Sequence, residues 1–174
     1  MLDDYDRILF LDVDVLVRPD SPNLFEMVPE DCYGAFMEGG WCSEQELLVR
    51  LGLLKKIVET YSISVPDFDL DKEYFNAGIF VASKQHKSLF VMPPDNNIMT
   101  EMVSEQNLIN VRLKNANFKT YHLPICFNCM SWRWSRNYIK ENYFVHYAGM
   151  EMETRIEMMR QDAEFFKKNF ERKE

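Results

Sequence analysis

Two aspartates interrupt the apolar stretch RILFLDVDVLV, which runs from residue 7 to residue 17. Large and β-branched apolar side chains dominate it and predict one β-strand from Ile8 to Val17. Because side chains alternate between the faces of a strand, Asp12 and Asp14 are expected to point the same way. Burying two carboxylates together raises the pKa of at least one of them unless a cation intervenes. The stretch therefore predicts that a cation partners the two acids.

The composition suits one folded domain with a negative charge. The chain has 174 residues, of which 47% are hydrophobic, enough for a core. Its formal net charge of -8 argues against non-specific binding to nucleic acid or to an anionic membrane. The sequence shows no basic leader before an apolar run, and no apolar segment long enough to span a bilayer. We therefore expect a soluble protein, with the cytoplasm favoured.

Strand and helix patterns alternate after the first strand. Residues 33–37, 74–82, 118–123 and 143–147 are typical of strands. Helices are predicted to start at Ser21-Pro22, at Ser104, and at the capping boxes 43–46 and 154–157. This alternation predicts an α/β domain with a largely parallel or mixed sheet.

Three further groups of polar or small residues sit where strands end or helices begin. They are Asn76 with Gly78, Glu105 with Gln106, and His146 with Gly149. Ligands of α/β sheets bind outside the carboxyl ends of strands, and small residues let a ligand approach the backbone. Purely structural explanations stay open for each group, because asparagine closes turns, acids favour the first turn of a helix, and a lone histidine is often a core residue.

Asp12, Asp14 and His146 together offer oxygen and nitrogen ligands that suit Mn²⁺ or Mg²⁺ shared with phosphate oxygens. The chain has no G-x-x-x-x-G-K-[ST] loop to cradle a phosphate with its backbone. A metal that carries a diphosphate would supply the cation that the two acids require. The alternative is a solvated and inert pair of acids at a strand end.

Four blocks of sequence, in order, resemble glycosyltransferase family 8, which includes glycogenin and the bacterial lipopolysaccharide galactosyltransferases. The blocks are RILFLDVDVLV, FNAGIFV, SEQNLIN and FVHYAG, and they extend from residue 7 to residue 149. The resemblance implies the C-terminal part of a GT-A fold, a mixed sheet flanked by helices. It also implies Mn²⁺ or Mg²⁺, a nucleotide-sugar donor (a UDP-sugar is expected), a carbohydrate or glycoconjugate acceptor, and transfer of a hexose with retention of anomeric configuration.

The same resemblance implies a role for each candidate residue. Asp12 and Asp14 would be the DxD metal ligands with His146 as the third, and Gly149 would lie beside the bound cofactor. The expected catalytic residues are Asn76 near donor and acceptor, Glu105 on the sugar hydroxyls, and Gln106 beneath the anomeric carbon. Since an amide is a poor nucleophile, front-face displacement fits Gln106 better than a covalent intermediate does.

Two departures from the family pattern change what we expect of this chain. The family has a substantial region ahead of its DxD strand, whereas here the motif lies at residues 12 and 14. We therefore expect residues 1–174 to form one N-terminally truncated domain with an open first strand. Either the chain is a fragment, or self-association or another chain supplies the missing strands, or the open edge is covered in an unusual way. The family's Lys-Pro-Trp after the histidine motif is also missing; Met152 stands near the lysine position, and Arg155 is the candidate substitute.

Two other functions compete with glycosyl transfer. A haloacid-dehalogenase-type phosphatase would use Asp12 as nucleophile and Asp14 as acid and base. Its motif normally continues Gly-Thr-Leu, whereas this chain continues Val15-Leu-Val17. The other alternative is a catalytically inactive remnant that binds a sugar or nucleotide and needs a partner chain.

Overall fold

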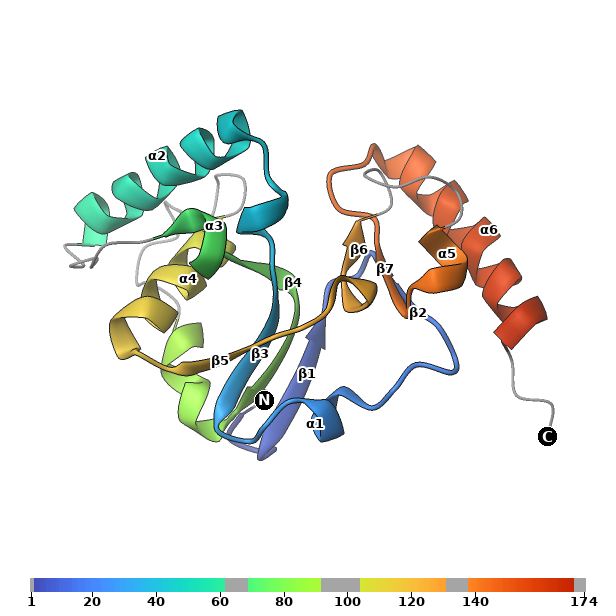
Figure 1. Ribbon diagram of the computed structural model, residues 1–174, viewed down its shortest axis with the longest axis horizontal. Helices are drawn as coiled ribbons and strands as arrows, with labels where there is room; N and C mark the ends of the chain where they lie inside the picture. The colour runs from blue at the N-terminus through green and yellow to red at the C-terminus, as the bar shows by residue number, and fades with distance from the viewer. Residues whose placement is uncertain (1, 62–68, 92–103, 131–137, 171–174) are drawn as a thin grey trace.

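The computed structural model describes residues 2–61, 69–91, 104–130 and 138–170, whose strands form two sheets flanked by helices (Figure 1). The strands are β1 (Arg7–Leu11), β2 (Val15–Val17), β3 (Cys32–Met37), β4 (Phe75–Ser83), β5 (Lys119–His122), β6 (Cys129–Met130) and β7 (Phe144–His146). The α-helices are α1 (Leu24–Met27), α2 (Glu44–Tyr61), α3 (Leu70–Glu73), α4 (Ser104–Ala116), α5 (Tyr138–Glu141) and α6 (Met152–Phe170). Short 3₁₀ helices are η1 (Gly39–Trp41), η2 (Lys84–Phe90) and η4 (Ile125–Phe127).

The larger sheet has four strands in the order β1-β4-β3-β5. In it, β4 runs antiparallel to β1 and to β3, while β3 runs parallel to β5. The smaller sheet has the order β2-β7-β6, with β7 antiparallel to β2 and parallel to β6. The predicted α/β class, with a mixed sheet flanked by helices, is confirmed.

Strand β4 is buried along its whole length because both of its faces are covered. On one face, Ile79 and Val81 pack into a core with Leu24 of α1 and Phe127 of η4. The alternate residues Phe80 and Ala82 face a second core with Tyr33, Leu89 and Leu113. A strand between two cores is expected to be apolar on both faces, and this explains the unbroken run in the sequence.

Helices α2 and α4 contact each other on one side of the four-stranded sheet (Figure 1). The predicted capping box opens α2. The Ser43 N–H donates to Glu46 Oε2 at 2.7 Å, and the Glu46 N–H donates to Ser43 Oγ at 3.3 Å. These bonds satisfy backbone donors that the first turn leaves without helical partners.

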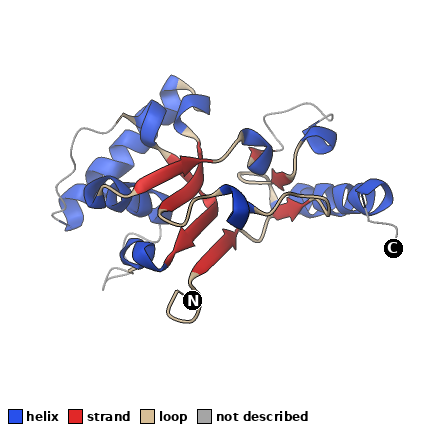
Figure 2. Ribbon diagram, turned by 60° about the horizontal axis from the view of Figure 1, so that its bottom comes forward, coloured by secondary structure: helices blue, strands red, loops and turns tan. Residues whose placement is uncertain are grey.

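The smaller sheet packs against α5 and α6 at the other end of the molecule (Figure 2). Val145 and Tyr147 from the strand β7 region share this core with Ile139 and with Phe166 of α6. No helix within the described ranges is both long enough and apolar enough to cross a lipid bilayer.

The prediction of one strand from Ile8 to Val17 is wrong. Strand β1 ends at Leu11 and β2 begins at Val15, and the two belong to different sheets. The Val15 N–H donates to Asp12 O at 3.2 Å across the turn, and the side chain of Val13 is 98% exposed. An apolar run does not reveal such a corner, although aspartate is a common turn residue.

Two predicted helix starts are also wrong. Helix α1 begins at Leu24 rather than at Ser21-Pro22, because the Asn23 side chain caps it by accepting from the Phe25 N–H at 3.0 Å. Helix α6 begins at Met152, so Thr154 lies inside it rather than at its cap. Asparagine and serine are similarly good N-caps, and sequence preference alone does not choose between neighbouring candidates.

Strand β1 is an edge strand, as the sequence led us to expect. The Asp12 N–H donates to Gly78 O at 2.8 Å and the Lys84 N–H donates to Asp6 O at 3.0 Å. In an antiparallel pair, hydrogen-bonded positions alternate, so the backbone groups of Arg7, Leu9 and Leu11 point away from β4.

Candidate functional site

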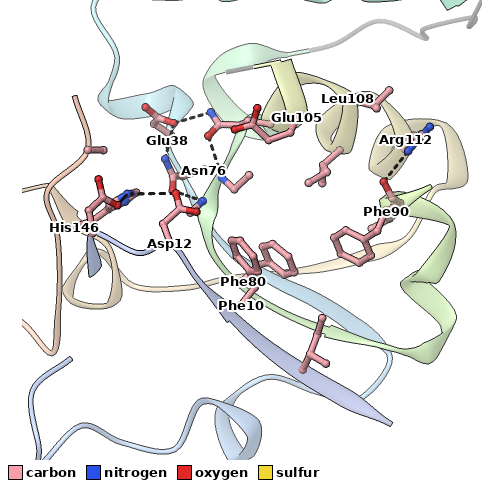
Figure 3. Close-up of a pocket in the computed structure, with 18 of the residues that line it drawn as sticks. Phe10, Asp12, Glu38, Asn76, Phe80, Phe90, Glu105, Leu108, Arg112 and His146 are labelled. Carbon is pink, nitrogen blue, oxygen red and sulfur yellow. Dashed lines mark hydrogen bonds and ion pairs between the residues drawn. The ribbon is translucent and has the colours of Figure 1, made fainter. Parts of the chain in front are cut away.

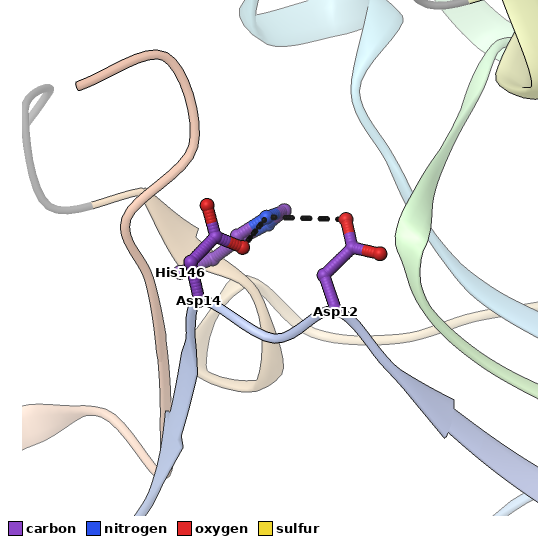
Figure 4. Close-up of side chains that lie close together, drawn as sticks. All are labelled: Asp12, Asp14 and His146. Carbon is purple, nitrogen blue, oxygen red and sulfur yellow. Dashed lines mark ion pairs between the residues drawn. The ribbon is translucent and has the colours of Figure 1, made fainter. Parts of the chain in front are cut away.

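The corner between β1 and β2 carries the two acids to one imidazole. The Asp12 N–H donates to Gly78 O of β4. The Asp14 C=O accepts from the N–H of Tyr147, the residue after β7, at 3.0 Å. The His146 Nε2 lies 3.7 Å from Asp12 Oδ2 and 3.4 Å from Asp14 Oδ1 (Figure 4). One ligand atom from each of these three residues lies within 4.8 Å of the other two. Asp12, Asp14 and His146 thus meet as predicted, but through a turn and not through strand alternation.

The two acids have pKa values that move in opposite directions. Burial raises the pKa of Asp12, and the nearby charges of Asp14 and Glu105 raise it further, against a lowering effect from His146. Contact with His146 lowers the pKa of Asp14 most, and the positive charge of Arg155 adds to that effect. Asp14 therefore keeps its negative charge readily, whereas Asp12 resists ionisation, mainly because it is partly buried.

His146 is held rigidly, with one ring nitrogen bonded and the other facing the acids. The ring is 2% exposed, and its Nδ1 lies 2.9 Å from Asn128 Oδ1. Its buried Nε2 makes no hydrogen bond to any residue that the structure describes. A buried ring nitrogen that touches two carboxylates at 3.4 and 3.7 Å without a well-formed hydrogen bond leaves room for an ion between them. Two carboxylates and an open imidazole nitrogen could hold a divalent cation.

Gly78 leaves the space that these side chains occupy. A Cβ built at this position would lie 2.4 Å from His146 Cε1 and 2.7 Å from Asp12 Oδ2. Contacts this short do not occur at a real Cβ, so any larger residue would displace the ring or the acid. The sequence predicted that a ligand approaches the backbone at Gly78. In the structure, the side chains of His146 and Asp12 occupy that space.

A cavity of about 830 Å³ extends from this cluster and collects the candidate residues (Figure 3). Its lining includes eight of the site residues that the sequence singled out: Asp12, Asp14, Asn76, Gly78, Glu105, Gln106, His146 and Gly149. The opposite end of the cavity is rich in aromatic side chains, with Arg112 beside them. There Phe80 stacks between Phe10, at 4.8 Å between ring centroids, and Phe90, at 5.2 Å.

The candidate amides belong to a buried network centred on Glu38. Glu38 Oε2 accepts from Asn76 Nδ2 at 3.1 Å and from Gln106 Nε2 at 3.0 Å, while Arg50 pairs with its other oxygen at 2.5 Å. Gln106 Oε1 accepts from the Ala77 N–H at 3.0 Å. Asn76 and Gln106 are therefore held in fixed orientations before any ligand arrives.

Glu105 and Gly149 are exposed residues of the same cavity lining, and Arg155 lies beside the acids. Glu105 is exposed in the first turn of α4 and near enough to Asp12 to raise its pKa. Gly149 has a φ of 72°, a left-handed conformation that favours glycine. Arg155 at the start of α6 places Nη1 3.0 Å from Asp14 Oδ2. The arginine considered as a lysine substitute thus lies beside the candidate metal ligands Asp12, Asp14 and His146.

Sequence reasoning missed Glu38, Arg50 and Asn128. Glu38 directly follows β3, so the rule that ligands gather at strand ends could have found it. Arg50 lies in the middle of α2, and Asn128 lies between η4 and β6, where no pattern marked them. Their roles depend on contacts with distant parts of the chain.

Comparisons with known proteins identify the family of the chain. A family model described as glycosyl transferase family 8 matches residues 1–152. Among solved structures, the crystal structure of mouse xyloside xylosyltransferase 1 in its apo form is similar, with 14% sequence identity and a TM-score of 0.46. The similarity covers 86% of this chain and 60% of that one, so this chain spans less than two thirds of its length. A search of curated proteins finds no match. Because the family match extends over most of its length, the chain belongs to glycosyl transferase family 8, as its four sequence blocks predicted.

Proposed function

We propose that this chain is a metal-dependent, retaining glycosyltransferase that moves a hexose from a nucleotide-diphosphate sugar to an acceptor hydroxyl. The observation that carries the proposal is the convergence of Asp12, Asp14 and the open Nε2 of His146 at one end of the cavity. Membership of glycosyl transferase family 8 supports the reaction class.

Asp12, Asp14 and His146 are the residues that would hold Mn²⁺ or Mg²⁺. When bound, the ion supplies the positive charge that the acids require and that a departing diphosphate requires. Arg155, already 3.0 Å from Asp14, would donate to the diphosphate in place of the family's lysine. Gly149 would keep the backbone open beside this group.

The proposed transfer replaces one bond to the anomeric carbon by another. The bond to the diphosphate oxygen breaks, the bond to the acceptor oxygen forms on the same face, and the hydroxyl proton passes to the leaving diphosphate. Glu105, an exposed residue of the cavity lining, would accept hydrogen bonds from sugar hydroxyls. Gln106, fixed by Glu38, would lie beneath the anomeric carbon, where positive charge develops, and Asn76 would lie near donor and acceptor.

The expected partners are a UDP-sugar donor and a carbohydrate or glycoconjugate acceptor. We also propose that residues 1–174 act as one transferase domain and that β1 pairs with a second chain. Its outward-facing backbone groups, at Arg7, Leu9 and Leu11, form the template for an added strand. Sedimentation velocity over a range of concentrations tests this, and a monomer throughout would eliminate self-association.

Titration calorimetry of Mn²⁺ with UDP or with GDP tests the metal and donor proposals. Asp14→Asn is expected to abolish Mn²⁺-dependent nucleotide binding without unfolding the protein. Asp6→Asn, which changes an exposed carboxylate paired with Lys84, is the matched control and should bind as the parent does. Unchanged binding in Asp14→Asn would contradict the metal assignment.

Turnover assays then separate the proposed enzyme from its alternatives. Hydrolysis of UDP-sugars or transfer from them, lost with a chelator and restored by Mn²⁺, is expected of the transferase. Mn²⁺-dependent nucleotide binding without turnover would identify an inactive binding remnant. Release of phosphate from a generic phosphomonoester, with no need of a nucleotide sugar, would identify a phosphatase.

A further inference from the structure

The neutral imidazole of His146 has two forms, with its single hydrogen on Nδ1 or on Nε2. Only the first form leaves a lone pair on Nε2, the atom that faces Asp12 and Asp14. The hydrogen positions follow from the hydrogen-bond network around the ring. Here that network is buried, since His146 is 2% exposed and Asn128 0%.

The network includes groups that can only accept or only donate a hydrogen bond, and these groups fix the orientation of the amide between them. The Glu38 carboxylate, paired with Arg50, only accepts hydrogen bonds, so Asn76 must present its NH₂ group at the 3.1 Å contact. The Gly78 N–H only donates, so the other end of Asn76 must present its oxygen at 3.0 Å. Both ends therefore require the same orientation of the Asn76 amide.

That orientation passes to the histidine through a second amide. Asn76 Oδ1 lies 2.9 Å from Asn128, which must present its NH₂ group there. Asn128 Oδ1 then faces His146 Nδ1 at 2.9 Å and can only accept. The Nδ1 atom must therefore carry the hydrogen.

We propose that the Asn76–Asn128 amide relay, oriented by Glu38 and the Gly78 N–H, fixes the hydrogen of His146 on Nδ1 and aims the Nε2 lone pair at the two acids. Asn128 is thus a positioning residue for the metal ligand. The tautomer follows from the network alone, whereas its consequence for metal binding rests on the proposed function.

His86 provides an internal comparison with the opposite arrangement. The Ser83 N–H donates to His86 Nδ1 at 3.0 Å, so that nitrogen is the acceptor. A neutral His86 must therefore carry its hydrogen on Nε2. Because the chain has three histidines, the ring signals of His86 and His146 can be assigned by single substitutions.

Nitrogen-15 NMR of the histidine rings, in metal-free protein and alkaline buffer, tests the proposal directly. Two-bond proton–nitrogen correlations distinguish the two tautomers. We expect the Nδ1–H pattern for His146 and the Nε2–H pattern for His86. An Nε2–H pattern for His146 in the parent protein would overturn the relay, whatever the metal affinity or activity.

Two substitutions of Asn128 separate orientation from packing. Asn128→Asp keeps an acceptor at Nδ1, so the Nδ1–H tautomer and Mn²⁺ affinity should persist. Asn128→Leu has a similar size but no acceptor, so His146 should show a mixture of tautomers and Mn²⁺ affinity should fall by about 10- to 100-fold. Unchanged His86 signals would verify the fold of each variant.

These measurements keep the relay and the transferase proposal distinguishable. A His146 Nδ1–H tautomer in a protein that binds no Mn²⁺ would support the relay and refute the metal site. A pure Nδ1–H tautomer in folded Asn128→Leu would refute the relay even if the protein is an active transferase. If Asn128→Leu does not fold, the parent and Asn128→Asp spectra decide.

Discussion

Replacing Gly78 by alanine tests whether the space beside β4 sets the positions of the candidate metal ligands Asp12 and His146. The added Cβ would lie 2.4 Å from His146 Cε1, whereas ordinary contacts begin at 3.4 Å. The ring would therefore have to recede by about 1 Å, the difference between these two distances. Since His146 is 2% exposed and bonded to Asn128 at 2.9 Å, such a shift stretches that bond and crowds the core.

The expected cost has two parts. Overpacking a buried site costs about 1–3 kcal/mol of unfolding free energy. Displacing a ligand from its supporting hydrogen bond lowers metal affinity by about 10- to 100-fold. Urea denaturation measures the first quantity, and Mn²⁺ titration calorimetry measures the second on the same preparation.

Gly52→Ala is the matched control for this substitution. A Cβ at Gly52 meets nothing within 4 Å, and the residue lies inside α2. Alanine there should stabilise the helix by up to about 1 kcal/mol and leave Mn²⁺ affinity unchanged. Parental Mn²⁺ affinity in a folded Gly78→Ala protein would refute the claim that Gly78 sets the positions of the ligands.

Three further substitutions test other parts of the structure. Arg155→Ala should weaken Mn²⁺-dependent UDP binding by about tenfold, which is the effect of losing one charge-assisted hydrogen bond. Binding of Mn²⁺ alone should not weaken. Equal UDP affinity of the variant and the parent by calorimetry would contradict the proposed role of Arg155. Arg50→Met leaves Glu38 buried without its cation and should cost about 3–5 kcal/mol in urea denaturation, and a loss below about 1 kcal/mol would show the pair to be dispensable. Ser43→Ala removes the cap of α2 and should cost about 1 kcal/mol by the same measurement, so an unchanged midpoint would argue against that cap.

Most secondary-structure elements were predictable because local patterns encode them. The capping box at Ser43 opens α2, and strands β3, β4, β5 and β7 lie within a residue or two of their predicted positions. The corner after Leu11 was not predictable from periodicity, because apolar residues flank it on both sides and each side joins a different sheet. Strand pairing, which is a long-range property, decided that break.

The identities of the candidate ligands were also available from the sequence. Carboxylates at 12 and 14 and an imidazole at 146 are side chains that could hold a divalent cation, since ligand type is a property of the side chain.

Only the tertiary structure decided how these side chains are oriented and which of their atoms face one another. The Asn76–Asn128 hydrogen bond joins residues 52 positions apart, and the Glu38–Gln106 bond joins residues 68 apart. The direction of each buried amide is set by its neighbours in space, and those neighbours come from separate elements. Sequence therefore determined which atoms could bind a cation, and folding decided which lone pairs face it, because hydrogen-bond direction belongs to the assembled network and to no single residue.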